Sequence, residues 1–186
     1  MKISVQSAVR AAAQMLGVAD GVEAHLLGEE TEAGKRDTEL LLECFNRVEN
    51  ELALDYLPLL AQDEKNAQGG RVSYAELSYP AARILRVEDV DGKALKYKLF
   101  PDHLQTSAGT VKVTYAYSPA QKSLDEESDY QTGVSERLFA YGMAAEYSLA
   151  EGELEGARAW DKKYREGIAA AYRVQAGKQI RSRRWI

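Results

Sequence analysis

Val-Lys-Val-Thr-Tyr-Ala-Tyr, residues 111–117, is the stretch that decides the fold class. Every second residue in it is apolar or aromatic, which is typical of a β-strand with one buried face. These alternate residues are Val111, Val113, Tyr115 and Tyr117. Because the segments on both sides of this region show helical patterns instead, the stretch predicts a β insert within a helical protein.

The sequence before this strand continues the same pattern. Ala67-Gln68-Gly69-Gly70 is a break, and the chain beyond it is rich in Val, Tyr, Ile and Thr with turn residues between short runs. A strand, a tight hairpin turn and a returning strand are predicted at Ile84–Val90, Asp91-Gly92 and Ala94–Leu99. Residues 101–109 are expected to form a loop. We therefore predict an antiparallel insert of three or four strands over about residues 71–118.

Apolar residues at helical spacing predict four helices around the insert. They recur every three or four residues, so each set lies along one helix face. A helix over Ser4–Gly17 is followed by a long one over Asp37–Leu60, which Pro58 ends or kinks. Two more helices follow from about Val134, with a break at Gly152. The four stripes are Val5, Val9, Ala12 and Leu16; Leu41, Phe45, Val48, Leu52 and Tyr56; Leu138, Tyr141, Ala145 and Leu149; and Ala157, Trp160, Tyr164, Ile168 and Ala171.

Glycines and short polar residues predict where these helices end and how closely they pack. Gly17 and Gly177 are the expected C-terminal stops. Asp37 or Thr38 is the expected N-cap of the long helix. Gly142 lies within the third stripe, where the absence of a Cβ would let another helix approach closely.

Two segments have no clear periodicity. Residues 20–37 are ambiguous, since Ala24–Leu27 is compatible with a short helix while Gly28 and Gly34 interrupt the pattern. Residues 120–131 are strongly polar, and we expect an exposed connector there.

The expected fold class is α+β, mostly α. It is a helical bundle of long helices, at about residues 4–60 and 134–177, with the small antiparallel β insert and an extended C-terminal arm. We expect one domain over residues 1–177 and the arm at residues 178–186.

Composition and charge exclude several classes of protein. The formal net charge of −5 argues against a general nucleic-acid binder. Residues 178–186 hold four basic and no acidic residues, which leaves 20 basic and 29 acidic residues, a net charge of −9, in the first 177. Cys44 is the only cysteine, so we expect a buried structural thiol and no intramolecular disulfide. No apolar run is long enough to span a bilayer and no signal peptide is visible, so no membrane partner is expected.

No catalytic, cofactor or metal site is predicted. His25 and His103 lie in different segments, and neither belongs to a metal-binding motif. His103 follows Asp102 in a predicted loop, where an exposed histidine is expected. The sequence contains neither a phosphate-binding loop nor a nucleophile elbow. We therefore expect no enzymatic activity and no cofactor.

Acidic and aromatic residues are abundant without forming an obvious site. Asp125, Glu126, Glu127 and Asp129 are expected to be solvated, with an acidic contact for a basic partner surface as the alternative. The eleven tyrosines are expected to pack in the core and at its edge. A stacking platform for single-stranded nucleic acid is disfavoured, because basic residues do not interleave with the tyrosines in the required pattern.

The nine residues 178–186 form the predicted partner-binding segment. Arginine and tryptophan are enriched at interface hot spots, and a tail beyond the last helix can become ordered when it docks. The alternatives are a frayed end and a weak, salt-sensitive contact with nucleic acid. The residues expected to bind are Lys178, Ile180, Arg181, Arg183, Arg184, Trp185 and Ile186.

Several stretches together carry a family resemblance. They are Val9–Val18; Tyr79–Val87 with Asp91-Gly92 and Val111–Pro119; Tyr141–Tyr147 with Ala157–Trp160 and Tyr164; and Arg181–Trp185. In this order they resemble the opening helix, the β segment, the C-terminal helix pair and the terminal motif of the head–tail connector proteins of tailed bacteriophages. These adaptor or head-completion proteins form a ring beneath the portal.

The resemblance implies a structural protein of the virion neck, assembled in the host cytoplasm. It implies a ring of about twelve copies between portal and tail. Such a ring extends the channel for double-stranded DNA, which passes without specific binding, and an acidic body would limit adhesion. It also implies attachment of a neck or tail-completion protein, and a portal-binding arm at residues 178–186 whose arginines pair with portal carboxylates.

Two alternatives stay open. One is a tail-completion or head-closure protein further down the neck, which the sequence barely separates from an adaptor. The other is a small DNA-binding module linked to packaging, which the basic residues 178–186 alone support.

Overall fold

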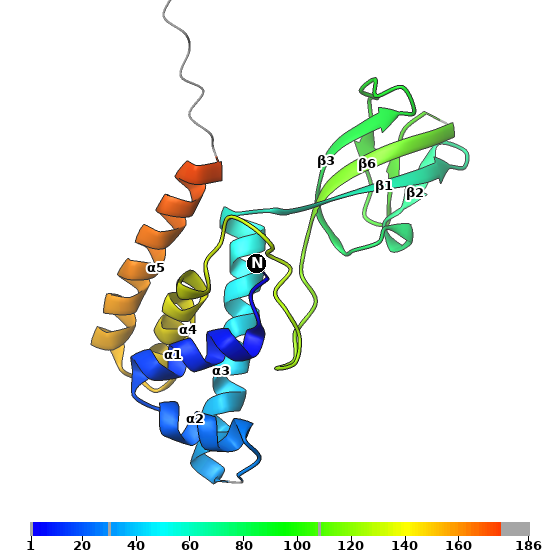
Figure 1. The fold of residues 1–186 in the computed structure, drawn as a ribbon. Coiled ribbons are helices and arrows are strands. Elements are labelled where there is room, and N and C mark those ends of the chain that lie inside the picture. Colours follow the sequence, from blue (N-terminus) through cyan, green and yellow to red (C-terminus); the bar gives the residue numbers. More distant parts are fainter. Residues whose placement is uncertain (1, 30, 108, 176–186) are drawn as a thin grey trace, which may run out of the picture. The chain divides into compact units, whose positions relative to one another are not determined.

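The computed structural model describes residues 2–29, 31–107 and 109–175 (Figure 1). The described chain is α+β, with five α-helices and two three-stranded antiparallel sheets. It forms two compact units. The helical unit comprises the chain up to Glu49 and from Lys122 onward, and the β unit is Asn50–Gln121. The predicted stop at Gly177 and the predicted arm at residues 178–186 lie outside the described residues.

The first helix, α1, confirms its prediction. It spans Val5–Leu16, and the Ser4 side chain accepts a hydrogen bond from the Ser7 N–H at its start. Gly17 ends it in the left-handed conformation, with φ 75°, and its N–H donates to the Ala13 carbonyl.

The ambiguous segment forms α2 and the start of α3. α2 spans Ala19–Leu26, and α3 spans Glu32–Glu51. Gly34 therefore lies in the first turn of α3, and the predicted break there is wrong. A Cβ on Gly34 would lie 2.2 Å from the carbonyl oxygen of Gly21, so the two glycines allow α2 and α3 to touch through their backbones.

The predicted N-caps of this helix are also wrong, because α3 begins one and a half turns earlier. The Thr31 hydroxyl oxygen accepts a hydrogen bond from the Gly34 N–H at 3.2 Å, which is the capping interaction. Thr38 lies within α3 and donates to the Gly34 carbonyl. Asp37 also lies within α3, and its carboxylate accepts a hydrogen bond from the Tyr147 hydroxyl at 2.9 Å.

Two helices, α4 (Glu136–Ala150) and α5 (Leu154–Gln175), complete the helical unit, and α4 packs against both α1 and α5. The predicted stripe of α4 is only partly right, since Leu138 is buried while Leu149 is 54% exposed. Packing on more than one side turns Phe139, Met143 and Tyr147 inward as well, and one stripe does not describe such a helix.

Gly142 of α4 lies at a close contact with other helices of this unit, as predicted. A Cβ there would lie 2.9 Å from Cε2 of Tyr164 on α5 and 2.9 Å from both γ-methyl groups of Val48 on α3. Next to this contact, Phe45 stacks on Phe139 with ring centroids 4.8 Å apart.

The connector over residues 120–131 is not simply exposed, because Ser128 and Tyr130 are buried. Glu49 on α3 explains this. Its Oε1 accepts hydrogen bonds from the Ser128 hydroxyl at 2.6 Å and from the Asp129 N–H at 2.8 Å. The connector also extends along the N-terminal segment, where the Ser128 N–H donates to the Ile3 carbonyl at 2.8 Å.

The β unit starts earlier than predicted. After one π-helical turn at Leu52–Tyr56, β1 spans Leu59–Ala67, so the predicted helix ends too late and the predicted insert begins too late. Pro58 explains the change, because it cannot continue a helix and favours extended backbone in the residue before it. Leu57 accordingly has φ −130° and ψ 75°.

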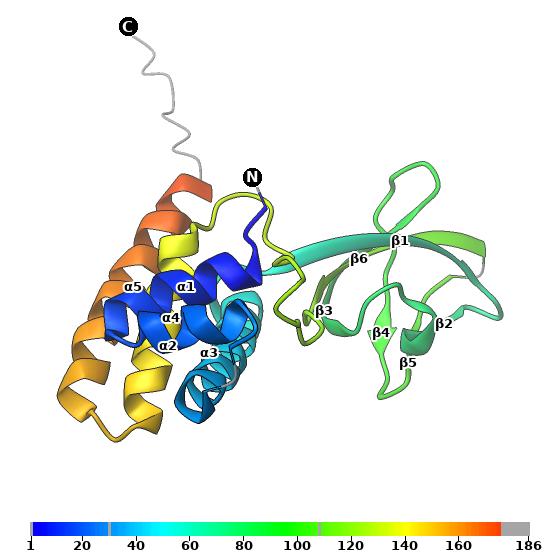
Figure 2. The same ribbon diagram turned by 60° about the horizontal axis from the view of Figure 1, so that its bottom comes forward.

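Two sheets make up the β unit (Figure 2). One has the order β1-β6-β3 and the other β2-β5-β4. The remaining strands are β2 (Arg71–Ser73), β3 (Ala81–Asp89), β4 (Lys98–Leu99), β5 (His103–Gln105) and β6 (Gly109–Tyr117). The central strand β6 confirms its prediction: its four alternate residues are all buried in the core of the unit.

The hairpin prediction is right at the turn and wrong beyond it. Gly92 has φ 80°, and the Asp89 carboxylate accepts from the Lys93 N–H at 2.8 Å. Only Ala94 of the predicted returning strand forms a bridge with β3, at Glu88. The rest leaves this sheet: β4 pairs with β5, a strand that lies in the predicted loop.

Inside the β unit, Asp63 connects strand β1 to the turn that precedes β3. Its carboxylate accepts hydrogen bonds from the Ser78 N–H at 2.6 Å and from the Tyr115 hydroxyl at 3.0 Å. Burial opposes ionisation of Asp63, but these bonds outweigh it and hold its pKa below the usual value. The charged carboxylate is therefore part of the folded unit.

Replacing Gly142 by alanine should destabilise the helical unit. Alanine is the better helix former, but the new methyl group collides with buried Val48 and Tyr164, and overpacking of this kind costs about 1–3 kcal/mol. Urea denaturation measures the change. Gly156→Ala is the matched control, because its added Cβ would meet nothing closer than 3.5 Å and stability should hold or rise. Equal effects of the two substitutions would contradict this account of the contact.

Glu49 should make stability depend on pH in a defined direction. Burial raises its pKa above the ordinary 4.5, and the hydrogen bonds from Ser128 and Asp129 offset this only in part. Such a carboxyl binds more protons in the folded state, so its contribution is complete below the unfolded pKa and is lost as pH rises through the folded pKa. Glu49→Gln stays neutral and keeps the acceptor oxygen.

Over about pH 4 to 8, Glu49→Gln should therefore gain stability relative to the wild type, as measured by urea denaturation. Glu64→Gln on β1 is the control, because Glu64 is exposed, and it should follow the wild type. A constant difference between Glu49→Gln and the wild type across this range would disprove the assignment.

Candidate functional site

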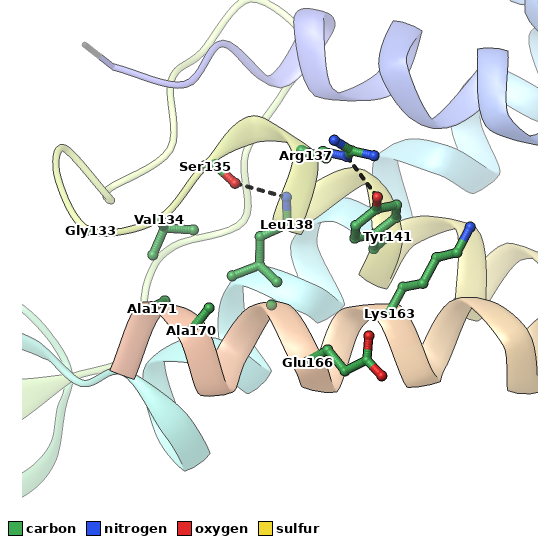
Figure 3. Close-up of a pocket in the computed structure, with 11 residues that line it drawn as sticks. Gly133, Val134, Ser135, Arg137, Leu138, Tyr141, Lys163, Glu166, Ala170 and Ala171 are labelled. Carbon is green, nitrogen blue, oxygen red and sulfur yellow. Dashed lines mark hydrogen bonds between the residues drawn. The ribbon is translucent and has the colours of Figure 1, made fainter. Parts of the chain in front are cut away.

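The helical unit has a groove between the first half of α4 and the second half of α5 (Figure 3). Its volume is about 810 Å³. Val134, Leu138 and the small residues of α5 make an apolar floor, and longer charged and aromatic side chains stand at the rim. The lining residues on α5 are Lys163, Glu166, Gly167, Ala170 and Ala171; those at the start of α4 include Ser135, Arg137 and Tyr141.

Local sequence explains the shape of the groove. The Ser135 side chain caps α4 by accepting a hydrogen bond from the Leu138 N–H at 3.2 Å. On α5, a Cβ at Gly167 would lie 2.6 Å from Cδ1 of Leu138, so this glycine lets α5 pass directly against the leucine. Small residues follow at Ala170 and Ala171, and among the described residues no larger side chain fills the groove.

Four side chains form what we call the aromatic–cation cluster: Arg137 and Tyr141 on α4, and Trp160 and Lys163 on α5. Arg137 Nε donates to the Tyr141 hydroxyl at 2.6 Å, as Figure 3 shows. Lys163 Nζ lies 4.3 Å from the Trp160 ring centroid and 5.7 Å from that of Tyr141. The two rings stack with centroids 6.0 Å apart, so both cations are held by aromatic faces.

The cations of this cluster have no carboxylate partner within the described part of the chain, where the ion pairs involve other residues. Arg165, on the same helix, is by contrast paired with Asp161 at 2.8 Å. Glu166 also lines the groove, so the three charged lining residues carry a net charge of +1. The groove thus combines an apolar floor with cations available for an anionic group.

This arrangement suits docking of another macromolecule. Tyrosine, tryptophan and arginine are the residue types that dominate interface hot spots. Here Arg137 and Tyr141 line the groove, and Trp160 stacks on Tyr141. Within residues 2–29, 31–107 and 109–175, no three His, Cys, Asp or Glu side chains gather to hold a metal ion. The residues that line the groove can bury an apolar side chain and form ion pairs.

The residues predicted from the sequence to bind a partner lie elsewhere. Lys178, Ile180, Arg181, Arg183, Arg184, Trp185 and Ile186 are all outside the described residues, so their role stays a prediction. Cys44 is buried as expected, and burial raises the pKa of its thiol to about 12.

The two histidines are not brought together, since His25 lies on α2 in the helical unit and His103 on β5 in the β unit. The prediction of an exposed loop histidine is wrong. His103 belongs to a strand, stacks on Phe100 with ring centroids 4.7 Å apart, and its Nδ1 lies 2.7 Å from Oδ1 of Asp102.

The acidic run in the connector is largely solvated, as expected. Asp125, Glu126 and Glu127 are exposed, and Glu127 pairs with Lys2 at 2.6 Å. Asp129 differs, because it is half-buried and pairs with Lys122 at 2.7 Å. The Glu127–Lys2 pair attaches the connector to the N-terminal segment of its own unit, while the Asp129–Lys122 pair lies within the connector.

The aromatic–cation cluster was missed from the sequence. Tyrosines were expected to pack without interleaved basic residues, yet Arg137 precedes Tyr141 by four residues and Lys163 follows Trp160 by three. Both spacings place a pair on one helix face, and this was the available signal. That the two pairs meet depends on the packing of α4 against α5.

The sequence matches no model of a known protein family and no curated protein. No helix among the described residues is both long and apolar enough to cross a membrane.

The aromatic–cation cluster should contribute little to the stability of the fold, because it lies at the surface. Lys163→Ala removes an exposed cation–π contact worth about 0.5–1 kcal/mol. Tyr164→Ala, at the next position, removes a buried ring and should cost about 3–5 kcal/mol. Chemical denaturation of both variants measures the difference. If Lys163→Ala were as destabilising as Tyr164→Ala, the cluster would be a folding element.

Proposed function

We propose that this protein is a structural adaptor of a tailed-bacteriophage virion, which docks on the portal ring and acts by assembly and not by catalysis. The observation that carries the proposal is the α4–α5 groove. It has hot-spot residue types around an apolar floor, which suits a protein that binds other protein subunits.

The order of the segments that resemble the connector family supports the proposal. Val9–Val18 covers most of α1 and the turn after it, Val111–Pro119 contains most of β6, and Tyr141–Tyr147 with Ala157–Trp160 falls on α4 and α5. Each of these segments therefore lies on its own helix or strand, while Arg181–Trp185 lies outside the described residues.

In this proposal the helices act as a bundle of long helices within a ring of about a dozen copies, from which residues 178–186 extend as an arm into the portal. The arginines of the arm would pair with portal carboxylates, while Trp185 and Ile186 would fill apolar pockets. The net charge of −9 on the first 177 residues would limit adhesion of the DNA that passes through the channel.

A place further down the neck, as a tail-completion or head-closure protein, is the nearest alternative. A DNA-binding packaging module is the second, which the basic residues 178–186 favour. The adaptor should bind the portal, the packaging module should bind DNA, and a protein further down the neck should bind neither. Measurements of portal binding and DNA binding therefore separate the three.

The test mixes the portal protein from the same genome with the full-length chain, and separately with a chain ending at Gly177, and weighs the complexes by mass photometry. Full-length chains should add to the portal as a near-stoichiometric set, and truncated chains should not, because they lack the arm. Charge reversal at Arg181, Arg183 and Arg184 should have the same effect as truncation.

Absence of binding by both forms would remove the adaptor reading and favour a place further down the neck. Binding of both forms would keep the adaptor but reject the arm. Salt-sensitive binding of double-stranded DNA by the full-length chain alone would instead support the packaging module.

A further inference from the structure

A second surface of the helical unit matches the groove in chemistry. Leu27 lies at the end of α2 and is 72% exposed. This is the highest exposed fraction among the large apolar residues of the described chain. Glu29 and Glu32 follow it and are exposed as well. We call Leu27, Glu29 and Glu32 the acidic tip.

The glutamates of the acidic tip have no basic partner within the described residues. The nearest cations along the chain are engaged elsewhere: Lys35 pairs with Glu39, and Arg36 pairs with Glu151 on α4. Burial of the exposed leucine against a partner would be favourable, and two carboxylates without a basic partner in the described chain suit a partner surface that also carries cations.

The α4–α5 groove has these properties. Its floor at Gly167, Ala170 and Ala171 has room for one branched aliphatic side chain, and Arg137 and Lys163 stand at its rim without carboxylate partners in the described chain. The two carboxylates of the acidic tip would pair with the two cations of the groove, and its leucine would enter the apolar hollow.

The tip and the groove of one copy cannot meet each other. Figures 1 and 2 both show the loop between α2 and α3 and the C-terminal end of α5 at opposite ends of the helical unit. A contact between tip and groove therefore joins two copies, and it repeats from one copy to the next. Repetition of such a heterologous contact closes a ring or continues as a filament.

We propose that the acidic tip of one copy docks in the α4–α5 groove of the next, with Leu27 on the small-residue floor and Glu29 and Glu32 paired with Arg137 and Lys163. This inference deepens the proposed adaptor function by naming the contact between ring neighbours, and its test needs no portal.

Charge argues for a second copy over the other occupants of the groove. Residues 178–186 of this chain carry four basic and no acidic side chains, so two rim cations would repel them. Double-stranded DNA needs several phosphate contacts for useful affinity, and the charged residues lining the groove supply a net charge of only +1.

Cysteine cross-linking with a short bismaleimide tests the contact. Full-length Leu27→Cys chains are mixed with full-length Ala170→Cys chains, and the native Cys44 does not compete because it is fully buried. The matched control is Ala169→Cys, which is exposed beside Ala170 on α5 but does not line the groove. Circular dichroism verifies that each variant is folded.

The cross-linked heterodimer should form with Ala170→Cys in clear excess over Ala169→Cys. Adding Arg137→Glu and Lys163→Glu to the Ala170→Cys chain should lower the yield about fivefold, as the loss of two exposed ion pairs predicts. Adding Glu29→Lys and Glu32→Lys to the Leu27→Cys chain should then restore it. Equal yields at positions 169 and 170, or a yield that ignores charge reversal, would overturn the proposal.

Competition by double-stranded DNA tests whether the groove binds DNA instead of a second copy of the chain. If DNA binds the purified chain through Arg137 and Lys163 and abolishes the cross-link, the groove is a nucleic-acid surface and the proposal fails. If the cross-link is absent while full-length chains still add to the portal, the adaptor function stands and this contact between neighbours falls.

Discussion

The helical unit depends on the close approach of three helices at Gly142. Val48 of α3 and Tyr164 of α5 occupy the space that a side chain at this position would need, so α4 lies directly against both neighbours. This contact sets the spacing of α4 and α5, and with it the width of the groove further along the same pair of helices. Gly167 of α5 likewise allows close packing, here against Leu138 of α4.

A buried carboxylate links α3 to the connector. Glu49 is 1% exposed, and the Ser128 hydroxyl and the Asp129 N–H satisfy one of its oxygens. Asn46 adds to this attachment, since its side chain accepts from the Lys122 N–H at 2.6 Å and donates to the Lys122 carbonyl at 3.1 Å. The chain re-enters the helical unit on these polar contacts, which explains why a polar segment is partly buried.

The same helix pair supplies both the packing and the surface of the candidate site. Tyr164 and Ile168 are buried on α5, while Lys163 lines the groove and its ammonium group lies over the Trp160 ring. Small residues at the floor leave an apolar hollow that the described residues do not fill. Arg137 and Lys163 line this hollow without a carboxylate partner in the described part of the chain, which suits assembly with acidic protein surfaces.

The sequence by itself determined α1, the central strand β6, the turn at Asp91-Gly92 and the role of Gly142, because capping, alternation and positive φ are local constraints. Only tertiary structure decided the start of α3, the strand β1, the pairing of β4 with β5 and the burial of Ser128. Each depends on a partner far along the chain, such as Gly21, β6 or Glu49. The aromatic–cation cluster belongs to this second group: spacing pairs Arg137 with Tyr141, and helix packing alone brings Trp160 and Lys163 beside them.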